Sequence, residues 1–328
     1  MKAQLSMIEI DEPLPVPDLT TYDFIVVNSS AGKDSQAMLD LVCTMADDAG
    51  VLARVVVVHA DLGRVEWGGT RELAEAQADR YGVRFVTVWR RQGDLLTQIE
   101  GRGKFPGPET RFCTAHHKTN LVSRVFTKLT AEARSGDLLE QIEERGKFPD
   151  AKNRYCTSDQ KRAQVHRLYT ALTNQANILA DEDTIKNKPV RILSCMGMRA
   201  DESPARAKKR PLVRNEAASN GRRHVDDWLP LHRWTEPEVW ERIHASRMAD
   251  LIHVAYSYGM PRLSCCFCIF APKAALVIAG KHNPELLAEY VRVEKKIGHT
   301  FRVNLSMAEV AEAVAAGDIP EEVKTWVM

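Results

Sequence analysis

The stretch Ser29-Ser30-Ala31-Gly32-Lys33-Asp34-Ser35-Gln36 decides the fold of this chain. It follows the apolar run Phe24-Ile25-Val26-Val27 and precedes residues 37–42, whose apolar side chains recur at helical spacing. A strand, a loop of small residues and a helix in this order form an anion site. Small side chains let backbone N–H groups approach phosphate oxygens, and the helix N-terminus adds partial positive charge. Lys33 adds a full positive charge to this site.

The Walker A loop, Gly-x-x-x-x-Gly-Lys-Ser/Thr, is the obvious alternative. It does not fit, because no glycine stands four residues before Gly32 or beside that position. Asp34 also stands where Ser or Thr should follow the lysine. The spelling Ser-x-Gly-Lys-Asp-Ser instead resembles the PP-loop of ATP pyrophosphatases, which grips the pyrophosphate end of ATP so that cleavage falls between the α and β phosphates. The plainer alternative is an ordinary strand–turn–helix with a serine-rich turn.

The bulk composition is that of a soluble globular protein, with 44% hydrophobic and 27% charged residues among 328. The net charge of +1 creates no global field that favours nucleic acid. The first residues lack the basic-then-apolar order of a signal peptide, and the richest apolar stretch, residues 263–279, is broken by Pro272 and Lys273. Seven cysteines without an export signal indicate a reducing, cytoplasmic location and no membrane partner.

Apolar runs and helical patterns alternate along the first part of the chain. Strands are expected at residues 24–27, 54–59, 84–89 and 190–195, and helices at residues 35–47 and 70–81. This rhythm predicts an α/β fold with a doubly wound, mostly parallel sheet that binds its ligand at the carboxyl ends of the strands. Asp61 stands just past the second strand, where such folds place a residue that faces the nucleotide. Alternatively, Asp61 only starts a loop.

A tandem duplication interrupts this pattern. Residues 93–118 recur as residues 136–161, with an offset of 43 and with 16 of 26 positions identical, inside repeat units that we place at 93–130 and 136–173. Two copies are too few for a solenoid. We therefore expect a duplicated helix-loop insertion in the α/β core, of which one copy occupies the ancestral place at the active site.

The chain divides into three expected parts. Residues 1–20 form an extended lead-in, residues 21–270 a PP-loop α/β domain, and residues 271–328 a helical C-terminal region. Within the second part, residues 206–223 are typical of an exposed loop, and Thr235 is typical of a helix N-cap.

Three cysteines lie within four residues of one another near the end of the second part. Cys265 and Cys268 form a Cys-x-x-Cys pair, which can hold a metal ion or cluster through two thiolates. Cys156 or Cys113, each in an Arg-aromatic-Cys-Thr context, is a candidate third ligand, and Cys266 or Cys195 a candidate fourth. Iron–sulfur is favoured over zinc, because no second Cys-x-x-Cys or pair of histidines completes a zinc site. The alternative is that these cysteines are small buried hydrophobes.

Several basic residues are candidates for binding anions. Arg199 and Arg206 follow the strand at 190–195 and could hold anionic oxygens with their planar forks, although a plain charged loop is the alternative. Lys161 and Arg162 follow Cys156, with a solvated helix face as the alternative. The runs 208–210 and 222–223 offer a local basic surface for nucleic-acid phosphates, or else a solvated loop.

Taken together, these motifs resemble the phosphoadenosine phosphosulfate reductase family within the PP-loop superfamily. They occur in family order at Ser30–Ser35, His59–Gly63, Arg154–Lys161, Gly197–Ser203, Trp228–Leu231 with Trp234–Thr235, and Cys265–Cys268. The resemblance implies a nucleotide α-hydrolase-like fold. Its relatives include assimilatory sulfonucleotide reductases and DNA phosphorothioation enzymes, which carry a cluster, and the small subunit of ATP sulfurylase, which does not.

The resemblance also implies roles for single residues. We expect the nucleotide to be bound by Ser29, Ser30, Gly32, Lys33, Asp34, Ser35, Asp61, Lys161 and Arg206. We expect catalysis to depend on Lys33, Asp34 and Arg199. The expected metal ligands are Cys156, Cys265, Cys268 and Cys266, with Cys113 and Cys195 as further candidates.

The sequence departs from the reductase pattern in ways that bear on the reaction. Sulfonucleotide reductases do not cleave ATP and usually lack the lysine–aspartate pair that is present here as Lys33 and Asp34. Their C-terminal catalytic cysteine is also missing, since no cysteine follows Cys268. In the repeat, Lys161 and Arg162 match the family pattern better than the first copy does, which favours Cys156 for the ancestral role.

These observations favour an ATP pyrophosphatase that adenylates an acceptor in sulfur transfer, such as thiolation of a nucleic acid. One alternative is a sulfonucleotide (PAPS or APS) reductase that releases sulfite, and another is a non-catalytic, metal-stabilised nucleotide-binding subunit. The expected cofactors are ATP, Mg²⁺ and an iron–sulfur cluster of the 4Fe–4S type, with zinc as the alternative. The expected partners are an adenine nucleotide, a nucleic-acid or small-molecule acceptor, a sulfur donor protein and a second copy of the chain.

Overall fold

A computed structural model of the chain describes residues 14–89, 93–107, 109–133, 189–221 and 223–323. The second copy of the repeat, with Cys156 and Lys161, lies outside these residues. In the part of the chain that is described, no helix is long and apolar enough to cross a membrane.

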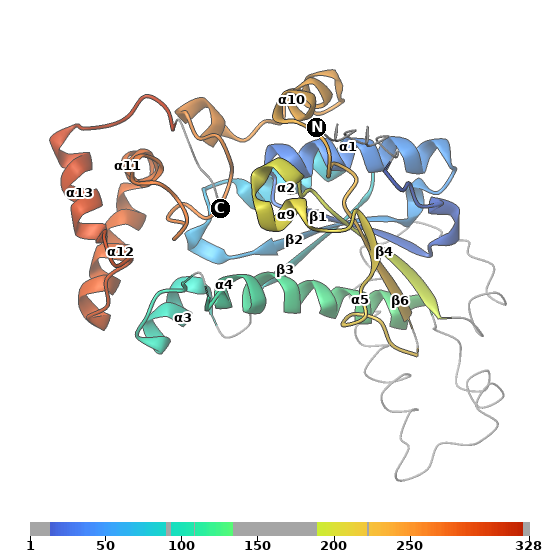
Figure 1. The fold of residues 1–328 in the computed structure, drawn as a ribbon, viewed down its shortest axis with the longest axis horizontal. Helices are drawn as coiled ribbons and strands as arrows, with labels where there is room; N and C mark the ends of the chain where they lie inside the picture. The colour runs from blue at the N-terminus through green and yellow to red at the C-terminus, as the bar shows by residue number, and fades with distance from the viewer. Residues whose placement is uncertain (1–13, 90–92, 108, 134–188, 222, 324–328) are drawn as a thin grey trace, which may run out of the picture.

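A six-stranded sheet forms the centre of the fold (Figure 1). Its strands lie in the order β3 (Arg84–Trp89), β2 (Val55–Asp61), β1 (Phe24–Ser29), β4 (Val190–Met196), β6 (Arg223–Trp228) and β5 (Leu212–Arg214). All neighbouring strands are parallel except β5 and β6, which are antiparallel. The predicted α/β fold with a doubly wound, mostly parallel sheet is confirmed.

Helices cover both faces of the sheet because its central strands are apolar on both sides. Ile25 and Val27 of β1 pack in one core cluster, and Phe24 and Val26 pack in another. The first face is covered by α1 (Lys33–Asp48), α2 (Thr70–Asp79) and α10 (Glu236–Ala245), and the second by α5 (Asn120–Ala133) (Figure 1).

Residues 206–223 differ from the exposed loop that the sequence predicts. They contain the edge strand β5, and residues 223–228 form β6, which the sequence analysis does not predict. Arg223, Asp226 and Asp227 interrupt the apolar pattern of β6, which explains why it is missed. Arg223 is also buried and donates hydrogen bonds to Ala218 and Thr127, so it does not belong to the basic surface that we expected at 222–223.

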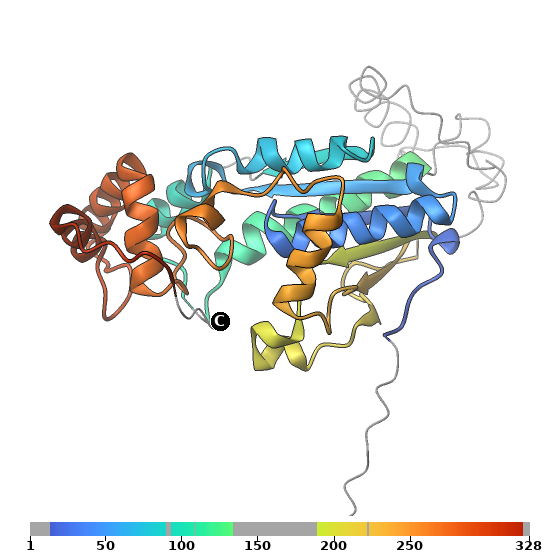
Figure 2. The same cartoon turned by 90° about the horizontal axis from the view of Figure 1, so that it is seen from above.

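Residues 93–119 of the first copy of the repeat and the C-terminal helices pack together beyond one end of the sheet (Figures 1 and 2). The first copy contributes α3 (Leu95–Arg102), α4 (Phe112–Thr114) and a π-helical turn at Ala115–Thr119. The expected C-terminal helices are α11 (Lys273–His282), α12 (Pro284–Ile297) and α13 (Met307–Ala316). Glu100 of α3 pairs with Arg292 and Lys296 of α12, and the two parts share one apolar core. This arrangement places the repeat next to the cysteine motif that precedes α11.

Candidate functional site

The loop between β1 and α1 is a tight turn closed by its own serines. The Ser35 hydroxyl lies 2.9 Å from the Gly32 carbonyl oxygen, to which it donates, and accepts the Ser30 N–H at 3.2 Å. The Ser29 hydroxyl accepts the Ala31 N–H at 3.1 Å. Ala31 has a φ of 57°, a left-handed conformation that disfavours residues with a Cβ atom. The expected strand, loop and helix are therefore present. The disfavoured conformation of Ala31 within the loop must be stabilised by the surrounding packing.

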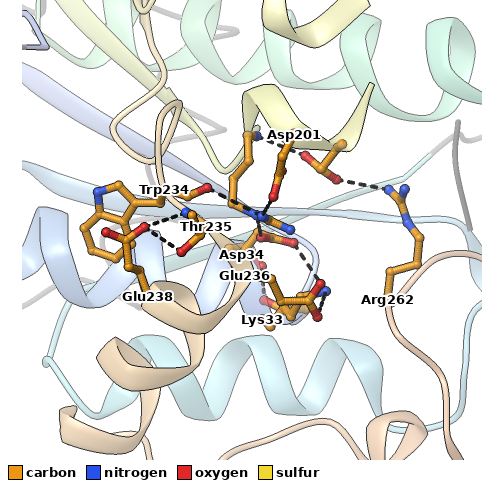
Figure 3. Close-up of polar contacts among 12 residues, drawn as sticks. Lys33, Asp34, Asp201, Trp234, Thr235, Glu236, Glu238 and Arg262 are labelled. Atoms are coloured by element: carbon orange, nitrogen blue, oxygen red, sulfur yellow. Dashed lines mark hydrogen bonds and ion pairs between the residues drawn. The ribbon is translucent and has the colours of Figure 1, made fainter. Parts of the chain in front are cut away.

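Lys33 is the first residue of α1 and is almost completely buried, with 2% of its surface exposed. Its ammonium group donates to the Pro261 carbonyl at 2.5 Å and lies 3.4 Å from the Glu236 carboxylate (Figure 3). Its backbone N–H donates to the Tyr256 hydroxyl at 2.7 Å. The one full positive charge in this loop is thus surrounded by oxygens from residues more than 200 positions away.

Asp34 forms a second ion pair at the same helix terminus. The Arg199 Nε lies 2.6 Å from Asp34 Oδ1, and Arg199 is 3% exposed. Burial raises the pKa of the Asp34 carboxyl, while the charges of Lys33 and Arg199 oppose that rise. The other side of the guanidinium lies 2.5 Å from Asp201 (Figure 3). The structure therefore brings together the three residues that the sequence assigns to catalysis.

Glu202 joins two further arginines to this network. It pairs with the guanidinium groups of Arg206 and, at 3.4 Å, Arg262, and its carboxylate accepts the backbone N–H of Arg199 at 3.0 Å. Arg206 is among the expected nucleotide-binding residues, whereas Arg262 is not. No spacing in the sequence links Arg262 to Glu202. The position of Arg262, three residues before Cys265, indicates only that it stands near the cysteine motif.

Gly197 lets β4 approach the first turn of α1. A Cβ atom built on Gly197 would lie 2.9 Å from the Asp34 backbone carbon and oxygen and 3.1 Å from the Ser35 nitrogen. Real Cβ atoms do not come so close to backbone atoms. This glycine therefore sets the distance between the loop that joins β1 to α1 at residues 30–32, which we call the anion loop after its predicted role, and the loop that carries Arg199.

Asp61 and His59 lie at the end of β2, beside β1. The Asp61 carboxylate accepts the Gly63 N–H at 2.7 Å, which is the loop-starting role left open by the sequence. His59, which the sequence analysis does not assign to a role, is 1% exposed. Its ring nitrogens lie 3.2 Å from the Ser29 carbonyl oxygen and 3.1 Å from the Glu66 carboxylate. His59 thus supports the last residue of β1 from the neighbouring strand.

The candidate metal-binding cysteines that the structure describes fall into two groups. Cys195 lies on β4 in the core that α1 covers, whereas Cys113, Cys265 and Cys268 pack against the core of the C-terminal helices, in which Cys266 is buried. Burial raises the pKa of the Cys265 thiol to about 12, an effect that the nearby Lys118 opposes. Burial likewise raises the pKa of Cys268.

These thiols do not form a metal site by themselves. Among the residues that the structure describes, no group of three or more His, Cys, Asp or Glu side chains is arranged to hold a metal ion. Cys156, the favoured third ligand, lies outside those residues, as does Lys161. The iron–sulfur cluster therefore stays a prediction from the sequence.

The sheet and the loop at the carboxyl end of β1 define a nucleotide-binding α/β protein of the PP-loop type. Comparison with protein families matches residues 24–271 to the phosphoadenosine phosphosulfate reductase domain, and the chain therefore belongs to this family. Members of the family are generally enzymes that act on nucleotides. No curated protein matches the sequence.

The close approach at Gly197 gives a first prediction. We expect Gly197→Ala to lower the free energy of unfolding by about 1–3 kcal/mol, because the added methyl group must push the first turn of α1 away. We also expect weaker pyrophosphate binding, measured by calorimetry. Gly101→Ala is the matched control, since nothing lies within 4 Å of a Cβ atom at that position. Equal behaviour of the two variants would contradict this role for Gly197.

His253 gives a second prediction, on pH. Its Nδ1 accepts the Ala255 N–H at 3.1 Å and caps the turn Val254–Tyr258, which carries Tyr256. Burial lowers the pKa of His253 from 6.5 to about 4, so the unfolded chain binds a proton more readily than the folded chain. The free energy of unfolding should therefore fall as the pH falls from 6.5 towards 4, by at most ~1.4 kcal/mol per pH unit from this group.

Urea unfolding across this pH range tests the prediction. His253→Asn keeps an acceptor for the Ala255 N–H but does not titrate, so its stability should depend less on pH than that of the wild type. His244→Asn, on an exposed residue of α10, should keep the wild-type dependence. If both variants follow the wild type, His253 is not the group responsible.

Proposed function

We propose that this protein cleaves ATP between the α and β phosphates, transferring AMP to an acceptor and releasing pyrophosphate, and that a sulfur nucleophile then attacks the adenylated acceptor and displaces AMP. The observation that carries the proposal is the grouping of Lys33, Asp34 and Arg199 at the N-terminus of α1, at the carboxyl end of β1. Sulfonucleotide reduction does not cleave ATP and does not need this lysine–aspartate pair. A nucleic acid is the favoured acceptor class, with the exposed run 208–210 as its basic surface.

Catalysis in this proposal is electrostatic and positional. The leaving pyrophosphate gains negative charge as the bond to the α phosphate breaks. The Lys33 ammonium group and the N-terminal N–H groups of α1 stabilise that charge. Arg199 orients Asp34 through the 2.6 Å ion pair and adds a second buried cation to the site.

Mg²⁺ fits the carboxylates of this site. In nucleotide sites this ion is commonly held by one or two carboxylates together with substrate phosphates and water. Asp34 and Asp201, which both contact Arg199, would hold it. When bound, the ion supplies Lewis-acid stabilisation of the phosphate oxygens.

The reductase alternative is less well supported. It needs a cysteine that a sulfonate group can reach, and Cys266 is the spare member of the motif. Cys266 is 1% exposed, and burial raises the pKa of its thiol, which disfavours the nucleophilic thiolate.

Lys33→Ala tests the proposal. We expect release of pyrophosphate and AMP from ATP and Mg²⁺ to fall by about 10²-fold or more, by analogy with the loss of one oxyanion donor. Because Lys33 is buried against Pro261 and Glu236, this variant should also be less stable, so its folding must be checked by circular dichroism. Lys281→Ala, on an exposed residue of α11, is the matched control and should keep full activity.

The same assay distinguishes the alternatives. Sulfite release from a sulfonucleotide and a thiol donor would identify a reductase instead. Nucleotide binding without any turnover, with candidate acceptors present, would identify a non-catalytic subunit. Pyrophosphate release that is unchanged in Lys33→Ala would contradict the proposed site.

A further inference from the structure

Residues 254–263, which we call the strap, lie directly on the anion loop. The Tyr256 hydroxyl accepts the N–H of Lys33, the first residue of α1, at 2.7 Å. The Pro261 carbonyl accepts the Lys33 ammonium group at 2.5 Å. N–H groups at a helix N-terminus and a lysine ammonium group are the donors that phosphate uses. The strap therefore occupies a backbone donor and the charged donor of the predicted phosphate site.

The packing between loop and strap is close as well as polar. A Cβ atom on Gly32 would lie 3.2 Å from the Leu263 Cβ and 3.2 Å from the Tyr256 hydroxyl. Lys33 is 2% exposed, and the ring of Tyr256 lies 5.6 Å from its ammonium group. In this conformation a phosphate group cannot contact Lys33 unless the strap moves.

Glu236 competes for the same charge from a different element. Its carboxylate lies 3.4 Å from the Lys33 ammonium group, at the start of α10. The Lys33 side chain is 3% exposed and that of Glu236 is 45% exposed, so the acidic partner is accessible to solvent and the basic one is not. An anionic ligand at Lys33 must replace this carboxylate.

The strap also leads directly into the cysteine motif. Leu263 stands two residues before Cys265, and the N–H of Cys266 donates to the Val65 carbonyl at 2.9 Å. At the other end, His253 caps the turn that carries Tyr256. With His253 and Cys266 anchored on either side, a displacement of Pro261 and Leu263 changes the backbone between these anchors, which includes Cys265.

We infer that the strap is an autoinhibitory element: it competes with the phosphates of the nucleotide for Lys33, and its displacement changes the backbone next to Cys265. This inference rests on the proposed function, because it takes the anion loop as the site of the pyrophosphate end of ATP. It adds that the nucleotide site and the cysteine motif are coupled through residues 254–263.

The experiment uses the full chain and inorganic pyrophosphate with Mg²⁺ as the probe. Hydrogen exchange should become faster at the strap amides when pyrophosphate binds, including that of Leu263, whose side chain lies against Gly32. A ligand that binds without displacing the strap would slow exchange there. The expected sign is thus opposite to ordinary protection by a ligand.

Two variants test the competition by calorimetry. Glu236→Gln should bind pyrophosphate about two- to fivefold more tightly, the range expected when one partly exposed ion pair is removed. Tyr256→Phe removes the hydroxyl that accepts the Lys33 N–H and should also bind more tightly, although it is less stable. Glu241→Gln on the same helix changes the net charge equally and should bind as the wild type does. If Tyr256→Phe does not fold, the pyrophosphate affinity of Glu236→Gln alone decides whether the competition exists.

The outcomes separate the two proposals. Slower exchange at the strap, together with unchanged affinity in Glu236→Gln, overturns the inference and leaves the proposed function intact. If neither the wild type nor either variant binds pyrophosphate, the anion loop is not a pyrophosphate site and both proposals fail. Binding of pyrophosphate by the variants but not by the wild type supports the inference that the strap is autoinhibitory.

Discussion

The positive charge of Lys33 sits at the positive end of a helix dipole and out of contact with water, and the site depends on how this charge is balanced. A buried ammonium group without partners is strongly destabilising. Here the chain supplies the Glu236 carboxylate, the Pro261 carbonyl and, at 4.0 Å, the Asp34 carboxylate. Asp34 is held in turn by Arg199. The residues of the predicted anion site thus also determine which parts of the chain lie on top of the loop.

The first strand, loop and helix could be predicted from the sequence because their signals are local. An apolar run, small residues with Gly32, and helical periodicity stand next to one another within residues 24–42. The edge of the sheet could not be predicted in this way. In β6, Asp227 accepts from Asn215 at 2.9 Å, so its charge is satisfied by tertiary structure, while the sequence shows only an interrupted apolar pattern.

The site was predicted only in part, for a related reason. Motif spacing identifies Lys33, Asp34, Arg199 and Arg206, which follow two neighbouring parallel strands. Tyr256 and Pro261 contact Lys33 across more than 200 residues, and neither carries charge or stands at a motif position. Such contacts leave no periodic pattern in the sequence. The close packing of Leu263 on Gly32 explains why position 32 does not accommodate a side chain.

The repeat shows a different limit of sequence reasoning. The sequence favours Cys156 over Cys113 for the ancestral role because Lys161 and Arg162 match the family pattern. In the described part of the chain, Cys113 packs against the same core as Cys265 and Cys268, and the guanidinium of Arg111 lies 4.5 Å from the Phe270 ring centroid. Cysteine, arginine and lysine are retained at equivalent positions in both copies, so identity alone does not discriminate between them.

The energetics of the strap suit an element that is displaced in use. A neutral hydrogen bond such as that between Lys33 and Tyr256 contributes about 0.5–1.5 kcal/mol, and a partly exposed ion pair such as that with Glu236 about 0.2–1 kcal/mol. Each charge-assisted bond to a phosphate contributes about 1.5–3 kcal/mol. The bond from the Lys33 ammonium group to the Pro261 carbonyl is itself charge-assisted, so a pyrophosphate group must make several such bonds to displace the strap. Part of its binding free energy is then spent on moving residues 254–263, which makes the backbone before Cys265 sensitive to whether a nucleotide is present.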